Sequence, residues 1–262
     1  MMDLGLGGRT ALVTGASKGI GKGVARELHA QGCTVHLVSR SMQNLEAAAD
    51  DIAGSDRRRI HLHAKDLSES KSVDELVTQV GTPDILINNA GAIPAGDLQS
   101  IDEARWREAW ELKVFGYINM TRAFLRAMEQ AGAGVIINVT GLAADRTDAG
   151  YVAGTAGNAG LNAFTRAVGG RSLSKGVRIL AVSPGPVETE RLVMLMQTRA
   201  KAEFGDPERW RHYLSNLPAG RAATVSEVAN VIVFMASDRA SFVSGTVITV
   251  DGGHGANQGS FT

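Results

Sequence analysis

The sequence predicts an α/β fold built on a parallel, doubly wound sheet of seven strands. Three observations lead to this fold class. Seven short runs of apolar, largely β-branched residues are typical of strands buried on both faces, and segments with helical spacing of apolar residues separate most of them. A glycine-rich turn follows the first run. Such alternation of strand and helix favours a parallel sheet with helices on both faces.

The apolar runs place the predicted strands at residues 11–14, 34–38, 60–64, 85–88, 135–139, 177–182 and 247–250. The predicted helices span residues 21–31, 45–52, 73–80, 104–131, 151–174 and 225–236. No linker, low-complexity tract or repeat divides the chain. We therefore predict a single domain over residues 1–262.

Residues 188–221 interrupt the alternation between the sixth and seventh strands. Two helical segments with apolar faces lie here and predict a lid. On one interpretation the lid is only an extra packing element. On the other it walls an apolar substrate pocket, because open α/β sheets bind ligands beyond the carboxyl ends of their strands. The wall residues would then be Leu192, Met194, Leu195, Met196 and Trp210.

Composition excludes several classes of partner. Lys plus Arg and Asp plus Glu each number 27, so no basic surface for nucleic acid is expected. No apolar stretch is long enough to span a membrane, and no basic-then-apolar leader begins the chain. The one cysteine, Cys33, is expected in the core, and the histidines lack the spacing of a metal site. We expect a soluble, cytoplasmic protein without a metal.

The turn after the first strand predicts the binding site for the pyrophosphate of a nicotinamide cofactor, as in a Rossmann-type fold. Glycines allow a tight turn and let backbone N–H groups approach the phosphates, which the N-terminus of the next helix then faces. The residues predicted to bind here are Gly15, Ser17, Lys18, Gly19, Ile20 and Gly21.

The end of the second strand indicates which nicotinamide cofactor binds. An acidic residue at this point would accept hydrogen bonds from the adenosine ribose of NAD, but the sequence has Ser39 followed by Arg40. A guanidinium recognises a 2′-phosphate, and Lys18 supplies a second positive charge. We therefore predict that NADP(H) is preferred over NAD(H).

Five motifs in order resemble the short-chain dehydrogenase/reductase family, in its form of about 250 residues, over nearly the whole chain. They are TGASKGIG at 14–21, Asp66-Leu67, NNAG at 88–91, Pro184-Gly185 followed by Thr189, and VDGG at 250–253. The resemblance implies further cofactor contacts from Asp66, Leu67, Asn89, Ala90, Gly91, Pro184, Gly185, Val187 and Thr189. It also implies a homotetramer, a dimer of dimers, in which His254 could reach a neighbouring cleft.

The family's chemistry rests on a Tyr that exchanges a proton with the substrate oxygen, a Lys four residues later, a Ser and an Asn. Here the resemblance assigns the Tyr to Tyr151, but the Lys position holds Thr155 and the Asn position holds Lys113. The Ser position holds Gly141, with Thr140 just before it. No Tyr-x-x-x-Lys occurs elsewhere in the chain.

On one hypothesis, Lys113 at the Asn position compensates for the lysine missing at Thr155. Lys113, on the helix beside that of Tyr151, would supply the positive charge that lowers the pKa of the phenol. Thr155 would relay a proton, and Thr140 would replace the Ser. The alternative is that the Lys113 side chain extends to solvent from a site that no longer works.

The sequence therefore leads to an NADP(H)-dependent oxidoreductase that acts on a small, mostly apolar alcohol or ketone through a non-standard catalytic site. One alternative is a catalytically silent NADP(H)-binding protein of the same fold. Another alternative is a different reaction at a bound carbonyl, such as hydration, which is supported only by analogy with other proteins of this fold.

Overall fold

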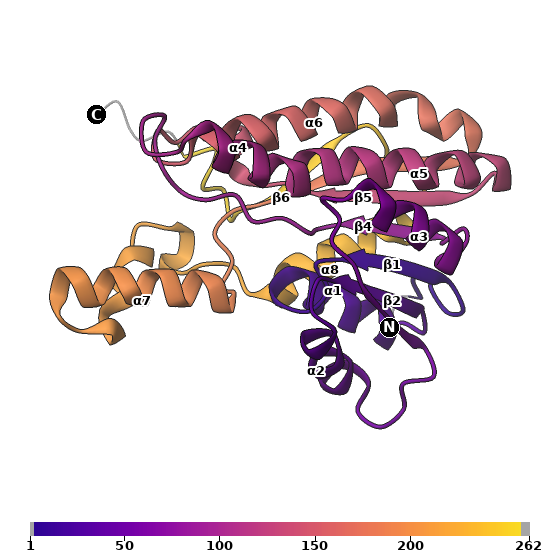
Figure 1. Ribbon diagram of the computed structural model, residues 1–262, viewed down its shortest axis with the longest axis horizontal. Helices are drawn as coiled ribbons and strands as arrows, with labels where there is room; N and C mark the ends of the chain where they lie inside the picture. The colour runs from indigo at the N-terminus through magenta and orange to yellow at the C-terminus, as the bar shows by residue number, and fades with distance from the viewer. Residues whose placement is uncertain (1–2, 258–262) are drawn as a thin grey trace.

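A computed structural model describes residues 3–257 and contains the predicted sheet (Figure 1). Seven parallel strands lie in the order β3-β2-β1-β4-β5-β6-β7. The strands are β1 (Thr10–Thr14), β2 (Thr34–Ser39), β3 (Ile60–Ala64), β4 (Ile85–Asn88), β5 (Gly134–Val139), β6 (Val177–Pro184) and β7 (Val247–Val250). Strands β2 and β3 are added on one side of β1, and β4 to β7 are added on its other side. The predicted doubly wound fold is therefore confirmed.

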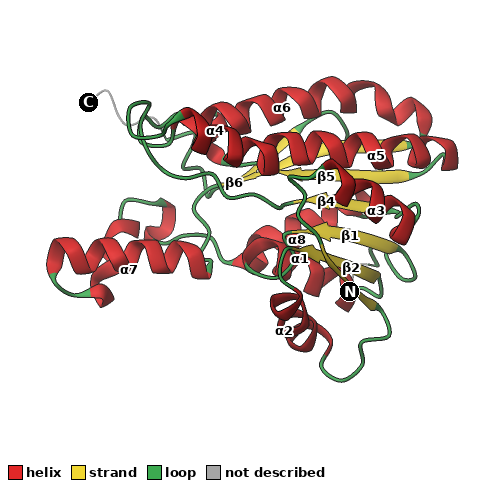
Figure 2. Ribbon diagram, in the orientation of Figure 1, coloured by secondary structure: helices red, strands yellow, loops and turns green. Residues whose placement is uncertain are grey.

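Helices cover both faces of the sheet (Figure 2). They are α1 (Gly19–Ala30), α2 (Met42–Ala53), α3 (Ser70–Val80), α4 (Glu103–Trp110), α5 (Gly116–Ala131), α6 (Val152–Ser172), α7 (Glu190–Phe204) and α8 (Val225–Ala236). Alternate strand residues point to opposite faces. Val13 therefore packs in the core under α1, α2 and α8, whereas Leu12 packs under α3 and α5.

The helix predicted over residues 104–131 is interrupted in the structure. The π-helical turn Glu111–Phe115 separates α4 from α5, and Lys113 is its buried residue. A π turn inserts an extra residue into a helix and often marks a functional position. Apolar periodicity does not register one such insertion, which explains why the sequence predicted a continuous helix.

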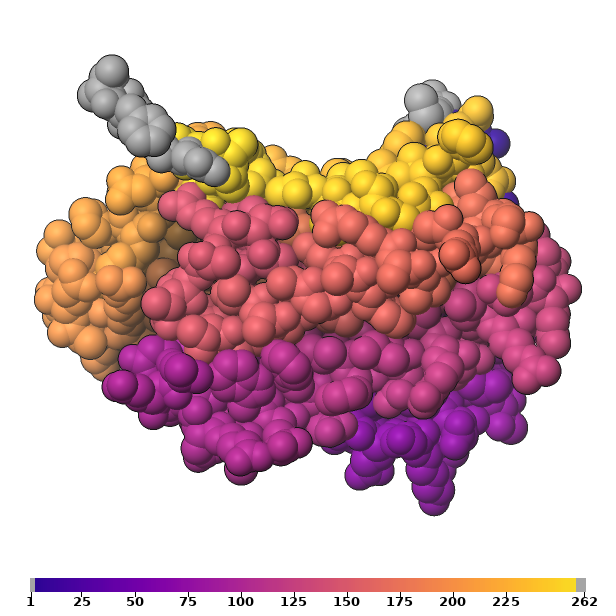
Figure 3. All heavy atoms as spheres, turned by 90° about the horizontal axis from the view of Figure 1, so that it is seen from above, coloured from indigo at the N-terminus to yellow at the C-terminus, as the bar shows by residue number. Residues whose placement is uncertain are grey.

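The segment predicted as a lid contains two helical pieces, of which the second differs from expectation. Helix α7 matches the first piece, but Pro207–Leu214 forms a 3₁₀ helix that Asp206 caps by accepting from the N–H of Glu208 at 2.9 Å. Figure 1 shows α7 set apart from the sheet, and Figure 3 shows the lid segment, in orange, at one end of the molecule.

The lid residues expected to wall an apolar pocket fall into two groups. Trp210, Leu192 and Met196 pack together in the lid's own core. Met194 and Leu195 are 60% and 50% exposed. This packing favours the interpretation in which much of the apolar stripe stabilises the lid itself. That residues 188–221 close over a ligand stays a prediction.

Two further expectations concern single residues and chain ends. Cys33 is fully buried, as predicted, and burial raises the pKa of its thiol to about 11. No helix among residues 3–257 is long and apolar enough to span a membrane. The single-domain prediction over 1–262 includes residues 1–2 and 258–262, which lie outside the described residues.

Candidate active site

The glycine turn between β1 and α1 leaves no room for a side chain at Gly15 or at Gly21. A Cβ on Gly21 would overlap the carbonyl oxygen of Gly15, and one on Gly15 would lie 2.9 Å from the Cα of Ala90. Gly15 and Gly19 have φ of 64° and 53°, in the left-handed region that favours glycine. The turn is therefore fixed by backbone contacts, as a close approach to a pyrophosphate requires.

The N-terminus of α1 is open to an anion. Lys18 occupies the N-cap position and no side chain caps the helix, so the first N–H groups of α1 lack a side-chain acceptor. With Ser17 and Ile20 on the same turn, the predicted phosphate site has the donors that a pyrophosphate needs.

The NNAG segment after β4 is joined to this turn. The backbone N–H groups of Asn89 and Ala90 donate to Oγ1 of Thr14 at 2.8 and 3.0 Å, and the Asn89 amide donates to the carbonyl of Thr14 at 3.1 Å. Asn89 thus holds β4 against β1, and it brings Gly91 to the same edge of the sheet.

The end of β2 presents the groups predicted to select the cofactor. Arg40 is exposed, and no hydrogen bond to another described residue engages its guanidinium. Ser39 donates weakly to the carbonyl of Ser41 at 3.4 Å. Asp66 accepts from the N–H and the hydroxyl of Ser68, while Leu67 beside it is buried. Arg40 is therefore available for a 2′-phosphate.

The loop after β6 joins the cofactor turn to the lid. Thr189 caps α7 by accepting from the N–H of Leu192 at 3.3 Å, and a Cβ on Gly19 would lie 3.2 Å from Cγ2 of Thr189. Val187 pairs with Ala223, and Gly185 donates to the carbonyl of Val250 at 3.0 Å, just after Pro184. The predicted nicotinamide side of the site is therefore continuous with both the phosphate turn and the lid.

Tyr151 stands one residue before α6 and folds back over its first turn. A Cβ on Gly154 would overlap the Tyr151 ring. The ring packs with Trp110, Ile93 and Ala153. Burial raises the pKa of the Tyr151 phenol, and the positive charge that opposes this shift belongs to Arg191 of the lid.

Lys113 is buried against a different tyrosine. Its Nζ donates to the hydroxyl of Tyr117 at 2.9 Å and to the carbonyl of Val139 at 2.7 Å, while Tyr117 also donates to Val139 at 3.0 Å. Burial lowers the pKa of Lys113 to about 7. The alternative of a solvent-exposed Lys113 is wrong, since the residue is 9% exposed. The prediction that Lys113 lowers the pKa of Tyr151 is also wrong, because burial raises that pKa and the opposing charge is that of Arg191.

The two threonines of the predicted catalytic set are engaged elsewhere. Thr140 is buried, and its hydroxyl donates to the carbonyl of Val182 at 3.5 Å. The hydroxyl of Thr155 accepts from the N–H of Asp148, also at 3.5 Å. Their catalytic roles stay predictions.

Asn158 is a site residue that the sequence did not single out. It lies on α6 four residues after Gly154, and a Cβ on Gly141 would lie 3.2 Å from its Nδ2. Asn158 is buried, and its Oδ1 has no hydrogen-bond partner among the described residues. Asn158 therefore lies beside the Ser position at Gly141, and the ring of Tyr151 fills the space where a side chain at residue 154 would lie.

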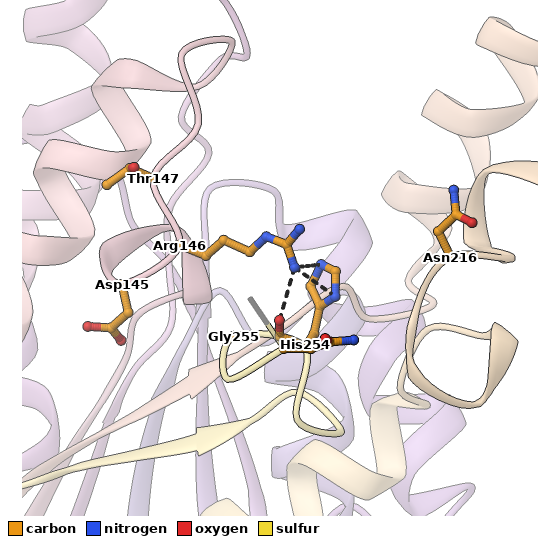
Figure 4. Close-up of a pocket in the computed structure, with 7 residues that line it drawn as sticks. Asp145, Arg146, Thr147, Asn216, His254 and Gly255 are labelled. Carbon is orange, nitrogen blue, oxygen red and sulfur yellow. Dashed lines mark hydrogen bonds between the residues drawn. The ribbon is translucent and has the colours of Figure 1, made fainter. Parts of the chain in front are cut away.

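A polar cavity of about 590 Å³ opens beside this site (Figure 4). It is lined by Asp145, Arg146, Thr147, Asn216, His254, Gly255 and Asn257. Nη1 of Arg146 donates to the carbonyl of His254 at 2.9 Å and contacts the imidazole. Burial, and next the Arg146 charge, lower the pKa of His254. His254 therefore contacts its own chain's loop, a contact that the sequence did not predict.

Comparison with known proteins identifies the family. A family model described as enoyl-(acyl carrier protein) reductase matches residues 15–255. A solved structure described as a short chain dehydrogenase/reductase family protein is 35% identical, with a TM-score of 0.83 over 97% of this chain and 100% of that one. The chain belongs to the short-chain dehydrogenase/reductase family.

Relatives of this short-chain dehydrogenase/reductase are named as dehydrogenases and reductases. Galactitol 2-dehydrogenase (L-tagatose-forming) of Cereibacter sphaeroides is 32% identical over 95% of this chain and 96% of its own. The 3-oxoacyl-(acyl-carrier-protein) reductase FabG of Escherichia coli K12 is 32% identical over 94% and 97%. L-sorbose reductase of Gluconobacter frateurii, solved with NADPH and L-sorbose, is 28% identical, with a TM-score of 0.89 over 97% and 98%.

Proposed function

We propose that this protein is an NADP(H)-dependent oxidoreductase that interconverts an alcohol and a ketone. The observation that carries the proposal is the backbone-fixed glycine turn, opening onto an uncapped helix N-terminus, with the exposed Arg40 at the neighbouring strand end, where its charge also acts on Asp66. A relative solved with NADPH supports the same cofactor preference. The dinucleotide would lie across Gly15, Gly19 and Gly21, with its 2′-phosphate at Arg40.

When bound, the cofactor supplies or accepts a hydride at C4 of its nicotinamide. The protein's part is proton transfer at the substrate oxygen, which we assign to the phenol of Tyr151. A phenol with its ordinary pKa of about 10 is already protonated near pH 7 and can donate in the reductive direction, whereas the burial that raises the pKa of Tyr151 makes it a weaker acid. The Arg191 charge opposes that shift and would favour the reverse direction.

In this proposal Lys113 acts through position rather than through contact with Tyr151. Its Nζ holds the carbonyl of Val139, which precedes Thr140 and Gly141. A Cβ on Gly91 would lie 3.1 Å from Cβ of Lys113, so the side chain also underlies the NNAG loop. Lys113 thereby fixes the floor of the site. Proton relay by Thr155 and a Ser-like role for Thr140 complete the proposed non-standard set.

The expected apolar substrate has its support in Met194 and Leu195, which lie exposed on α7. The cavity lined by Arg146 and His254 favours a hydroxylated substrate instead. Galactitol 2-dehydrogenase and L-sorbose reductase, whose names refer to hydroxylated substrates, are relatives that favour the same choice.

A catalytically silent NADP(H)-binding protein is the second candidate, because two observations at Tyr151 speak against turnover. No lysine lies four residues after Tyr151 or after Gly154, and burial holds the Tyr151 phenol protonated. The two candidates are separated by measuring the oxidation of NADPH, through the loss of its absorbance, in the presence of a panel of sugar ketones and simple ketones.

The enzyme proposal predicts ketone-dependent oxidation that Tyr151→Phe and Lys113→Met both abolish, while Thr155→Lys raises it little. Tight NADPH binding without turnover of any ketone would favour the silent candidate. Turnover that survives Tyr151→Phe would remove the assigned role of the phenol.

We also propose a cytoplasmic homotetramer. The support is the resemblance to the family, whose members pair the helices that correspond to α5 and α6 across a two-fold axis; Phe115, just before α5, is 46% exposed. Light scattering should give four times 27.6 kDa, and a monomer would contradict this part of the proposal.

A further inference from the structure

We infer that the cavity between Arg146 and the lid binds the hydroxyl groups of a neutral polyol or sugar ketone. The inference rests on the proposed function and names its substrate class. The cavity is formed by three segments far apart in sequence, namely the loop after β5, the lid near Asn216 and the turn after β7 (Figure 4).

Position ties this cavity to the site of reaction. Leu142 follows Gly141 and lies between the two regions: a Cβ on Gly255, in the cavity wall, would lie 2.8 Å from Cδ1 of Leu142, and one on Gly185 would lie 3.8 Å from its Cδ2. Gly185 belongs to the predicted nicotinamide-side loop. A chain of a few carbon atoms could therefore reach from the reacting carbon into the cavity.

The donors and acceptors of the wall fit hydroxyl groups. Nη1 of Arg146 is held by His254, whereas no hydrogen bond to a described residue engages Nε or Nη2. Asn216 offers both a donor and an acceptor on the other side of the cavity (Figure 4). A hydroxyl is both donor and acceptor, so a polyol can pair with each of these groups.

Charge distinguishes a neutral ligand from an anion. Arg146 would attract a carboxylate or phosphate, and the negative charge of Asp145, a lining residue whose carboxylate points away from the Arg146 guanidinium (Figure 4), opposes that attraction from nearby. The Asp251 carboxylate lies next to this wall, where it accepts from the N–H groups of Gly253 and Gly255 at 2.8 and 2.7 Å. Mixed charge therefore favours a neutral hydroxylated ligand, and the absence of large apolar side chains from the wall disfavours an alkyl chain.

The test uses linear six-carbon probes in complexes that cannot react. Sorbitol, galactitol and mannitol are titrated calorimetrically against the full-length protein saturated with NADPH, beside 1-hexanol as the apolar match and gluconate as the anionic match. Each titration is repeated without nucleotide. The variants are Arg146→Met, Asn216→Ala and the control Arg209→Met, an exposed lid arginine outside the cavity wall.

We expect at least one hexitol to bind more tightly than both 1-hexanol and gluconate. Arg146→Met should weaken that binding about tenfold or more and Asn216→Ala by a smaller factor, with Arg209→Met within twofold. Tighter binding of gluconate would make the cavity an anion site, and tighter binding of 1-hexanol, or hexitol binding unchanged in Arg146→Met, would also overturn the inference. Failure to bind NADPH would instead reject the proposed function. The titrations without nucleotide would still show whether the cavity binds a hexitol, so the two failures can be distinguished.

Discussion

Two glycines that leave no space for a Cβ show how differently the two halves of the site are built. At the cofactor turn, the space beside Gly21 is filled by the Gly15 carbonyl, which is backbone. At the start of α6, the space beside Gly154 is filled by the ring of Tyr151, which is a side chain. Backbone cannot rotate away as a side chain can, so the cofactor half is rigidly specified, whereas the space at the start of α6 is filled by a group that can move.

The largest effect is expected at the rigid half. Gly21→Val should weaken NADPH binding by about 3 kcal/mol or more, roughly 100-fold, because the new side chain must displace the Gly15 carbonyl and the Asn89 amide. Fluorescence titration of NADPH measures the loss. The control Gly160→Ala adds a Cβ in open space on α6 and should leave binding unchanged while stabilising the fold slightly. NADPH affinity that survives Gly21→Val would place the nucleotide elsewhere.

In the catalytic half, the titration of the buried Lys113 should make the free energy of unfolding depend on pH in the alkaline range. Lys113 has a pKa of about 7 in the folded protein against 10.5 for the exposed amine, so the unfolded state binds more protons between these values. Stability should therefore rise with pH from about 7 to 10.5, by roughly 2 to 4 kcal/mol, and fall again as pH is lowered through this window.

Comparison with Lys113→Met isolates this effect. The variant should lose the rise with pH and should be at least as stable as the native protein at pH 7 or below, because Tyr117 can still donate to Val139 and no charge is buried. Urea unfolding at several pH values provides the measurement. Parallel curves for the two proteins would show that Lys113 does not titrate in this range.

The contact between Gly154 and the Tyr151 ring can be tested by a double-mutant cycle. Gly154→Ala should destabilise the native protein by about 1 to 3 kcal/mol, since its Cβ meets the Tyr151 ring. In a Tyr151→Ala background the same change should instead stabilise by up to about 1 kcal/mol, as alanine does in a helix. Thermal unfolding of the four proteins gives the coupling. Equal effects in both backgrounds would mean that the ring does not lie over Gly154.

The smallest effect is expected on the sheet of the cofactor half, where His36, His61 and His63 stack across β2 and β3. Burial, and next the two neighbouring imidazoles, lower the pKa of His36 to about 4 from 6.5. The unfolded state protonates first, so stability should be lost as pH falls from about 6.5 to 4, by about 1 to 2 kcal/mol after discounting for partial exposure. The difference curve against His36→Phe should show this slope, and its absence would refute the shift.

The sequence was sufficient for the sheet because buried parallel strands are continuous apolar runs. The predicted strands at 60–64, 85–88 and 247–250 coincide with β3, β4 and β7. The glycine turn was equally readable, since strand, glycines and helix follow one another along the chain. Local patterns of this kind need no knowledge of distant contacts.

The catalytic half could not be read in the same way. Tyr151 is the one tyrosine near the family position, so the sequence assigned the family's Tyr and Lys positions to Tyr151 and Thr155. In the structure, however, α6 begins at Val152, and the residue of α6 that lies beside Gly141 is Asn158. The pairing of Lys113 with Tyr117 depends on a π turn that periodicity does not show. Contacts between segments far apart in sequence, like that of Arg146 with His254, leave no local pattern.

The central claim is that an intact cofactor half selects NADP(H) while the catalytic half has changed. The most direct test is titration of NADPH and NADH against the native protein and Arg40→Ala. The control is Arg58→Ala, an exposed arginine whose side chain pairs with Asp56 and with no other described residue. We predict tighter binding of NADPH, with the difference between the cofactors narrowed by about 1.5 to 3 kcal/mol in Arg40→Ala and unchanged in Arg58→Ala. Equal affinity of the native protein for NADPH and NADH would contradict the account.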